Sequence, residues 1–136
     1  KLEYRDQRSV LKSITREVRH MFKDFFCDFD EQTAVDICSE STLVNFEVGD
    51  IVVKSREMTK GIYFILYGSA KIVYKGKLIG AYIEKQYCGD CCLVDRISGH
   101  SVICHEDLLC LFIPRILFML ILVRVENLVS KGVGEE

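Results

Sequence analysis

The sequence predicts an α+β domain that is mainly β, an antiparallel β-roll of the jelly-roll or double-stranded β-helix type flanked by N-terminal and C-terminal helices. Apolar residues recur at helical spacing near the N-terminus, and from Leu43 onward they form short β-branched and aromatic runs between turns. A chain of 136 residues that is 49% hydrophobic can bury one core without disulfides or metals. We expect a helical segment over residues 1–41 and the roll with its C-terminal helix over residues 42–136.

The N-terminal segment carries an amphipathic pattern. Its apolar residues recur every third or fourth position, with Lys, Arg and Glu between them, and predict one helix with an apolar stripe: Val10, Ile14, Val18, Met21, Phe22, Phe25 and Phe26. Asp28, Phe29 and Asp30 then form a predicted N-cap region, which starts a second, short helix over residues 31–38.

Turn signals divide the following region into short strands. They are Gly49-Asp50, residues 57–61, Gly68, Lys75-Gly76 and Glu84-Lys85. The segment Tyr74-Lys75-Gly76-Lys77 predicts a hairpin between residues 71–73 and 78–80, because glycine tolerates the positive φ that a two-residue connection requires.

Residues 108–123 are apolar apart from Arg115 and are long enough to suggest a membrane span. Pro114-Arg115 interrupts the run, which therefore predicts a buried strand followed by a helix that starts at about Arg115. This helix either relays occupancy of a site or simply covers the roll, and the sequence favours neither. No signal peptide is recognisable and both ends are charged, so we expect an excised part of a much larger protein.

The charge and the cysteines exclude several classes of function. A net charge of −2 and a pI near 6.0 argue against a nucleic-acid partner. The seven cysteines lie mostly inside apolar runs, which predicts reduced thiols in a cytosolic domain. A zinc site at Cys88, Cys91 and Cys92 would need a second ligand pair of comparable spacing, and only His100, Cys104 and His105 lie nearby, so we expect no metal.

The most informative stretch is residues 87–94, where Gly89-Asp90 separates a strand-like run from an apolar helix start. Such a turn aims backbone N–H groups at an anion, and the acid can hold a sugar hydroxyl. It is preceded by residues 46–53 and 62–68 and followed by residues 107–115. Together these ordered runs resemble the cyclic nucleotide-binding domain family over roughly residues 20 to 123.

The resemblance implies a regulatory β-roll with a pair of helices that moves when cAMP or cGMP binds. It implies that the amides of Gly89, Asp90, Cys91 and Cys92 face the phosphate. Asp90, one methylene shorter than the usual glutamate, would hold the ribose hydroxyl. No other cofactor is expected.

The family's phosphate-binding arginine is missing, because alignment places Ser98 at its position. Losing such a charge-assisted pair costs about 1.5–3 kcal/mol, or roughly one to two orders of magnitude in affinity. Arg96 is a candidate substitute, or else a solvated loop cation. His100 would serve only when protonated, and Ser101 completes the candidate set.

Two family glycines are also replaced, one within residues 54–57 and one near Lys85-Gln86, so these turns must use non-glycine geometry or another loop length. Such departures from the family pattern resemble those in the homologous domain of ether-à-go-go-type channels, which does not respond to cyclic nucleotides. The family's helical lid should be short or missing, since residues 130–134 offer little to extend a helix.

Two functional hypotheses follow. The first is a cyclic nucleotide-binding regulatory domain on the cytoplasmic side of a larger protein, a membrane ion channel or a sperm-type sodium/proton exchanger, that couples pocket occupancy to activity and oligomerises through this parent. The second is a nucleotide-independent domain that docks a partner protein or its own tail. We expect no enzyme, because no nucleophile and base stand at a recognised spacing and Ser98 with His100 is better explained as a loop.

Overall fold

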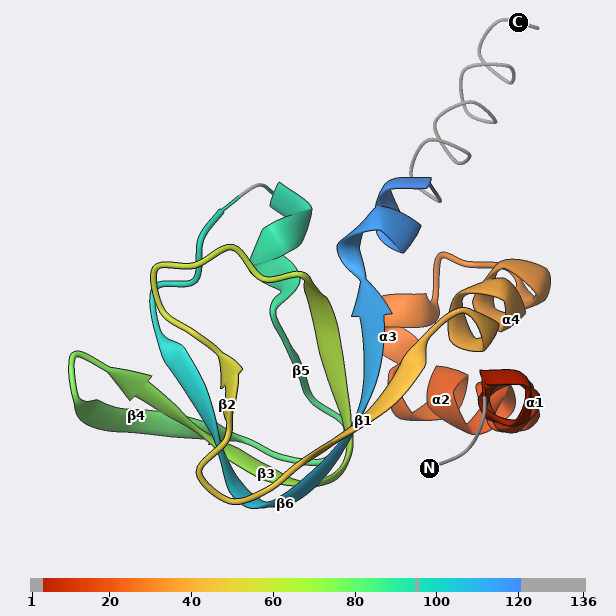
Figure 1. Ribbon diagram of the computed structural model, residues 1–136. Coiled ribbons are helices and arrows are strands. Elements are labelled where there is room, and N and C mark those ends of the chain that lie inside the picture. The colour runs from red at the N-terminus through yellow and green to blue at the C-terminus, as the bar shows by residue number, and fades with distance from the viewer. Residues whose placement is uncertain (1–3, 95, 121–136) are drawn as a thin grey trace, which may run out of the picture.

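A strongly bent antiparallel sheet closes into a roll, and four helices pack against one side of it (Figure 1). The computed structural model describes residues 4–94 and 96–120. The elements in chain order are α1 (Tyr4–Ser13), α2 (Thr15–Met21), α3 (Lys23–Phe26), α4 (Glu31–Ser39), β1 (Thr42–Phe46), β2 (Ile51–Val53), β3 (Gly61–Tyr74), β4 (Lys77–Tyr82), β5 (Tyr87–Cys88), η1 (Asp90–Val94) and β6 (Ser101–Pro114). The predicted mainly β roll with flanking helices is confirmed.

Strands β3 and β6, each 14 residues long, form the central antiparallel ribbon of the roll. The strand order is β1-β6-β3-β4, with β2 also paired to β6 and β5 to β3. The ribbon bends where its register shifts repeatedly between Ile65 and Ala70. Gly68 lies inside this bend at φ +93, and a Cβ there would collide with the carbonyl oxygen of Asp107. The prediction that Gly68 forms a turn between two strands is therefore wrong. Gly68 lies within β3 and allows this one strand to bend.

The predicted N-terminal helix is wrong as a single element. Ile14 (φ −97, ψ 2) and Phe22 (φ −118, ψ 40) interrupt it and divide it into α1, α2 and α3. The apolar stripe must follow a curved sheet, and the breaks let Phe22 and Phe25 both reach Phe64 of β3, each with ring centroids 4.9 Å apart. Contact with the sheet therefore overrides the helical periodicity.

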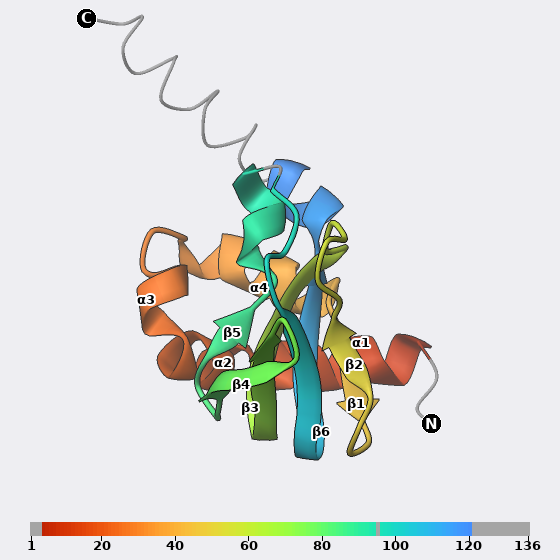
Figure 2. The same ribbon diagram turned by 90° about the vertical axis from the view of Figure 1, so that its left-hand side faces the viewer.

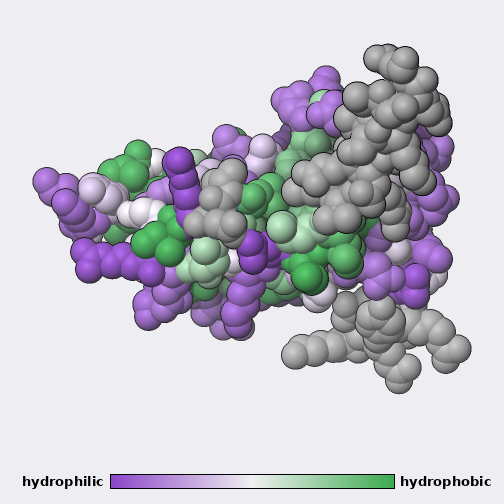
Figure 3. All heavy atoms as spheres, turned by 90° about the horizontal axis from the view of Figure 1, so that it is seen from above, coloured by the Kyte–Doolittle hydropathy of each residue, from purple (hydrophilic) through white to green (hydrophobic). Residues whose placement is uncertain are grey.

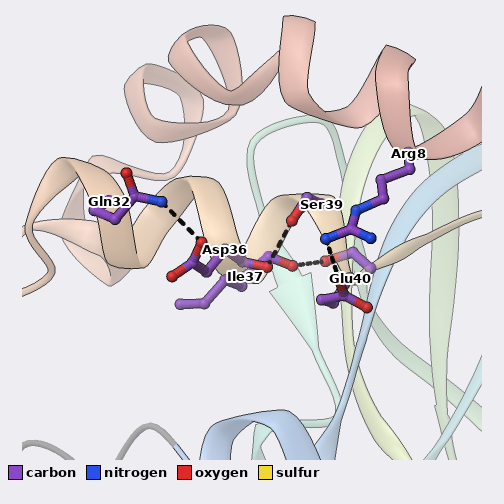
Figure 4. Close-up of polar contacts among 7 residues, drawn as sticks. Arg8, Gln32, Asp36, Ile37, Ser39 and Glu40 are labelled. Atoms are coloured by element: carbon purple, nitrogen blue, oxygen red, sulfur yellow. Dashed lines mark hydrogen bonds and ion pairs between the residues drawn. The ribbon is translucent and has the colours of Figure 1, made fainter.

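The second predicted helix is confirmed as α4. The carboxylate of Asp30 caps it by accepting a hydrogen bond from the Thr33 amide at 2.7 Å. Within α4 the Gln32 side-chain amide donates to Asp36 at 2.9 Å, and an ion pair of 2.9 Å joins Arg8 of α1 to Glu40 at the end of α4 (Figure 4).

Non-glycine residues adopt positive φ in the two turns that lack the family's glycines. Arg56 has φ +67 and Lys85 has φ +74, so both turns keep the left-handed backbone that glycine favours. The expected non-glycine geometry is therefore wrong at these two residues. Their amides donate to the carbonyls of Ser98 at 2.8 Å and of Ile65 at 3.0 Å, which holds the turns in this conformation. The predicted hairpin is confirmed, with Lys75 and Gly76 at φ +49 and +78 between β3 and β4.

Strand β6 ends at Pro114 and residues 115–120 are helical, as predicted. The rest of this predicted helix and the expected short lid at residues 126–134 lie outside the described residues. Among those described, no helix is long and apolar enough to cross a membrane.

Buried side chains form two clusters on opposite sides of the β3–β6 ribbon. The helix-facing cluster joins the helices to the sheet: Leu11, Val18, Phe22, Phe26, Ala34, Ile37, Cys38, Ile62, Phe64, Cys92, Leu111, Ile113 and Phe118. The roll-interior cluster is smaller and less aromatic: Val52, Val53, Ile65, Ala70, Cys88, Val102, Cys104, Leu108 and Cys110, with Phe46, Tyr63 and Tyr82 packed against it. Figure 2 shows the roll from the side opposite the helices.

Candidate functional site

The roll has an open end, which carries the loop of residues 54–60 between β2 and β3, the turn of η1, and the loop that enters β6 (Figure 1). A cavity of about 340 Å³ lies beneath the 54–60 loop. Its lining residues are Ile51, Val52, Val53, Lys54, Glu57, Met58, Thr59, Lys60 and Tyr63. Three of them, Val52, Val53 and Tyr63, belong to the roll-interior cluster or pack against it, so the cavity adjoins this cluster. Seen onto this end, apolar side chains are interspersed with polar ones (Figure 3).

The connection between β5 and η1, which we call the Gly89 turn, adjoins this cavity through Thr59. The Thr59 hydroxyl donates to the carbonyl oxygen of Gly89 at 2.7 Å, and its oxygen lies 3.9 Å from the sulfur of Cys91. Gly89 has φ +91, and a Cβ there would lie 2.6 Å from the carbonyl oxygen of Gly61. Only glycine fits this close approach of two backbones, so the turn at this position requires the glycine that the sequence analysis singled out.

The predicted anion-binding amides are only partly available. Of the four, the Cys92 amide is engaged within the turn, because it donates to the Gly89 carbonyl at 3.2 Å. The η1 turn is a single short 3₁₀ segment of five residues rather than a long helix. Asp90, the predicted ribose contact, is exposed at its start.

The loop of residues 96–101 clamps the 54–60 loop. The Ser98 amide donates to the Glu57 carbonyl at 3.2 Å and the Arg56 amide donates to the Ser98 carbonyl at 2.8 Å. The hydroxyl of Ser101 accepts from the Ser55 amide at 3.1 Å. These three bonds hold the roof of the cavity in place.

Ser98 is buried, with 5% of its surface exposed, and its hydroxyl donates to the carbonyl oxygen of His100 at 2.6 Å. That hydroxyl is engaged within its own loop, and Arg96 is exposed. The predicted site residues thus surround the open end, but none of them is among the residues that line the cavity.

Two lysines of the cavity wall were missed by sequence reasoning. Lys54 and Lys60 line the cavity, and the Lys54 ammonium lies 3.7 Å from the Glu57 carboxylate. The available signal was the charge of a single connection, which holds Lys54, Arg56 and Lys60 between two strands. Lysine binds phosphate as a point charge, although less directionally than arginine.

The interior groups near the site stay neutral at ordinary pH. Burial, followed by the proximity of Cys110 and Asp90, raises the pKa of the Cys88 thiol far above its ordinary value. Burial and the neighbouring Cys88 also raise the pKa of the Tyr63 and Tyr82 phenols. A protonated thiol is neither a nucleophile nor a metal ligand. All seven cysteines are free, and within residues 4–94 and 96–120 no cluster of His, Cys, Asp or Glu is arranged to hold a metal.

The open end is connected directly to the helical side. Cys92 of η1 is fully buried in the helix-facing cluster, and its carbonyl accepts a hydrogen bond from Arg115 Nε at 3.0 Å. The Arg115 amide donates to the carbonyl of Lys60 at 2.8 Å. Arg115, where the C-terminal helix starts, is therefore held both by η1, directly after the Gly89 turn, and by the loop of residues 54–60 over the cavity.

The fold is that of cyclic nucleotide-binding β-roll domains. No family model and no curated protein matches the chain. The regulatory subunit of a cAMP-independent protein kinase A from Trypanosoma brucei superposes on 95% of this chain with a TM-score of 0.74 and 16% sequence identity. The regulatory domain of Toxoplasma gondii protein kinase A with cAMP superposes on 96% of the chain, with a TM-score of 0.70 and 20% identity. The regulatory subunit of a cAMP-independent protein kinase A from Trypanosoma cruzi, bound to guanosine, superposes on 80% of the chain, with a TM-score of 0.70 and 19% identity. The chain spans 48%, 51% and 39% of these structures, respectively.

Proposed function

We propose that this chain is a non-enzymatic regulatory domain in which a cyclic nucleotide occupies the open end of the roll. The observation that carries the proposal is the cavity of about 340 Å³ beside the Gly89 turn, in a fold shared with cAMP-binding regulatory domains. Tyr63 and Thr59 supply polar groups to this cavity, and Val52 and Val53 supply an apolar wall. Pockets for small molecules are commonly of this size and mixed character.

Occupancy reaches the helices through Arg115. A ligand that displaces the 54–60 loop or the Gly89 turn alters one of the two hydrogen bonds that hold the start of the C-terminal helix. Cys92 transmits the same displacement into the helix-facing cluster. The response is limited to the difference in ligand affinity between the two positions of this helix.

The phosphate would be bound without arginine at the family's position. Lys54 and Lys60 at the cavity wall and Arg96 in the loop of residues 96–101 are the cations that would face it, while Asp90 would hold the ribose. Since none of these cations offers a preformed buried fork, we expect affinity weaker than in arginine-containing relatives by roughly one to two orders of magnitude.

Calorimetric titration of the reduced chain with cAMP and with cGMP, up to millimolar ligand, tests the proposal. We expect saturable binding that Asp90→Ala weakens and that the matched exposed substitution Asp28→Ala leaves unchanged. Equal isotherms for the wild type and Asp90→Ala would remove this carboxylate from the site. The double variant Lys54→Ala and Lys60→Ala should weaken both nucleotides and leave guanosine, which has no phosphate, unaffected.

A second candidate is a nucleotide-independent docking domain. It is favoured by Ser98, whose buried hydroxyl is bonded to His100 where the family places its arginine. The similar structure from T. brucei is described as cAMP-independent, and the one from T. cruzi binds guanosine. No heat with either cyclic nucleotide from the folded chain would support this candidate, and saturable binding of guanosine alone would assign a nucleoside ligand.

For the parent protein we propose a larger assembly, a membrane ion channel or a sodium/proton exchanger, in which this domain lies on the cytoplasmic side. The support is the sequence resemblance to divergent channel domains, and oligomerisation would occur through the parent. Proteomic identification of the full-length chain tests this directly, and a parent without a transport domain would contradict it.

A further inference from the structure

The roll has a second distinctive surface at its closed end, where β3 and β6 bend and the β1–β2 turn lies, opposite η1 (Figures 1 and 2). Two hollows of about 540 and 590 Å³ lie on either side of Tyr67 and Asp107, which line both, and together we call them the closed-end groove. Its lining combines acidic side chains with the exposed side chains of Val48, Tyr67 and Ile83.

The closed-end groove is acidic. Glu47, Glu84, Glu106 and Asp107 contribute carboxylates, and its lining contains no lysine or arginine. The wall of the open-end cavity, in contrast, carries Lys54 and Lys60 with Glu57 as its single carboxylate. Concentrated charge of one sign attracts partners of the opposite sign and repels anions such as nucleotides and acidic lipid surfaces.

The same groove exposes apolar side chains. Val48, Tyr67 and Ile83 are 66%, 59% and 56% exposed. An aromatic ring with aliphatic neighbours inside a charged rim is the composition of a protein-binding hot spot. The Tyr67 ring can also stack with a guanidinium group.

The groove is rigid. The backbone of Gly68 touches that of Asp107 so closely that no Cβ fits between them. The Ser69 hydroxyl donates to the Glu106 carboxylate at 2.9 Å, the Glu47 amide donates to Asp50 at 2.8 Å, and the Ile83 amide donates to the Gln86 side chain at 2.8 Å. A preorganised surface loses little conformational entropy on binding.

We propose that the closed-end groove docks an arginine-bearing amphipathic segment of a partner protein. Guanidinium groups would stack on Tyr67 and pair with Glu106 and Asp107, because arginine matches carboxylates in a bidentate fork. Aliphatic side chains of the segment would cover Val48 and Ile83. The groove lies away from the open end, so this proposal does not depend on nucleotide binding.

Fluorescence anisotropy with a labelled synthetic 14-residue peptide, which carries Arg and Leu at helical spacing, tests the charge. The double variant Glu84→Lys and Asp107→Lys should weaken binding at least about tenfold. The matched pair Asp24→Lys and Asp28→Lys changes the net charge equally on the helical side, and should leave binding within about twofold. Equal losses in both double variants would show nonspecific attraction and overturn the proposal.

A second pair of variants tests the apolar contact. Ile83→Ser should weaken the peptide several-fold, whereas Ile97→Ser, at a residue that is similarly exposed near the open end, should not. A peptide with Glu in place of Arg should not bind. Sedimentation that showed self-association lost in Glu84→Lys and Asp107→Lys would assign the groove to a second copy of the chain instead. An unchanged cyclic-nucleotide isotherm in these variants separates this test from that of the open end.

Discussion

The two sides of the β3–β6 ribbon differ in how fully they are packed. On the helix-facing side the Phe64 ring contacts those of Phe22 and Phe25. The ring centroids of Phe25 and Phe118 lie 5.4 Å apart. The roll-interior side is built from aliphatic residues and three cysteines, and it borders a cavity. One face of the sheet thus fixes the helices through aromatic contacts, while the other face borders the cavity in which we propose that a ligand binds.

The largest expected effect is on the aromatic side. Phe64→Ala should lower the free energy of unfolding by about 3–5 kcal/mol, because a fully buried ring is lost from a packed cluster. Val52→Ala at the cavity wall should cost only roughly 1.5 kcal/mol, since it removes two methyl groups beside space that already exists. Urea denaturation of both variants measures the difference. Equal losses would contradict the contrast between the two sides.

Gly89 lies in the chain between Cys88 of the roll-interior cluster and Cys92 of the helix-facing cluster. Gly89→Ala should destabilise the chain by roughly 1–3 kcal/mol, because the new Cβ would meet the Gly61 carbonyl at positive φ. Gly99→Ala is the matched control in the same region, since a Cβ there meets nothing within 4 Å. Thermal denaturation should separate the two variants, and similar midpoints would mean that the Gly89 turn yields easily.

Alkaline pH provides a test of the helix-facing cluster. Burial raises the pKa of the Cys38 thiol from 9.0 to about 11. Between these values the unfolded chain releases a proton that the folded chain retains, so Cys38 contributes its stability below pH 9 and loses it as the pH rises toward 11. The Cys38→Ala variant should show a shallower loss of stability over this range in urea titrations at several pH values. Parallel curves would place the alkaline loss at other groups.

The smallest effect is expected at the surface of the helical side. Arg8 and Glu40 form an ion pair of 2.9 Å, but their side chains are 45% and 42% exposed. Arg8→Ala should therefore change the free energy of unfolding by less than about 1 kcal/mol. A larger loss in urea denaturation would mean that α1 depends on this contact rather than on the buried Leu11.

The flanking helices and the hairpin at Lys75-Gly76 were predictable from local periodicity and turn chemistry. The roll and the importance of Gly89 followed from the ordered runs that resemble a known family. The positive φ at Arg56 and Lys85 was not predicted, because the replaced glycines indicated another turn geometry, whereas the folded chain keeps the left-handed turn.

Which groups face the cavity, and where the helices break, depend on packing between segments that are far apart in the chain. Ile14 and Phe22 leave the helical conformation because the apolar stripe must follow a curved sheet. Lys54 and Lys60 line the cavity from the loop between β2 and β3, and the distant loop of residues 96–101 holds that loop in place. Contacts of this kind join segments far apart in the chain, as between Ser55 and Ser101, which are 46 residues apart. Local patterns carry no record of that long-range register.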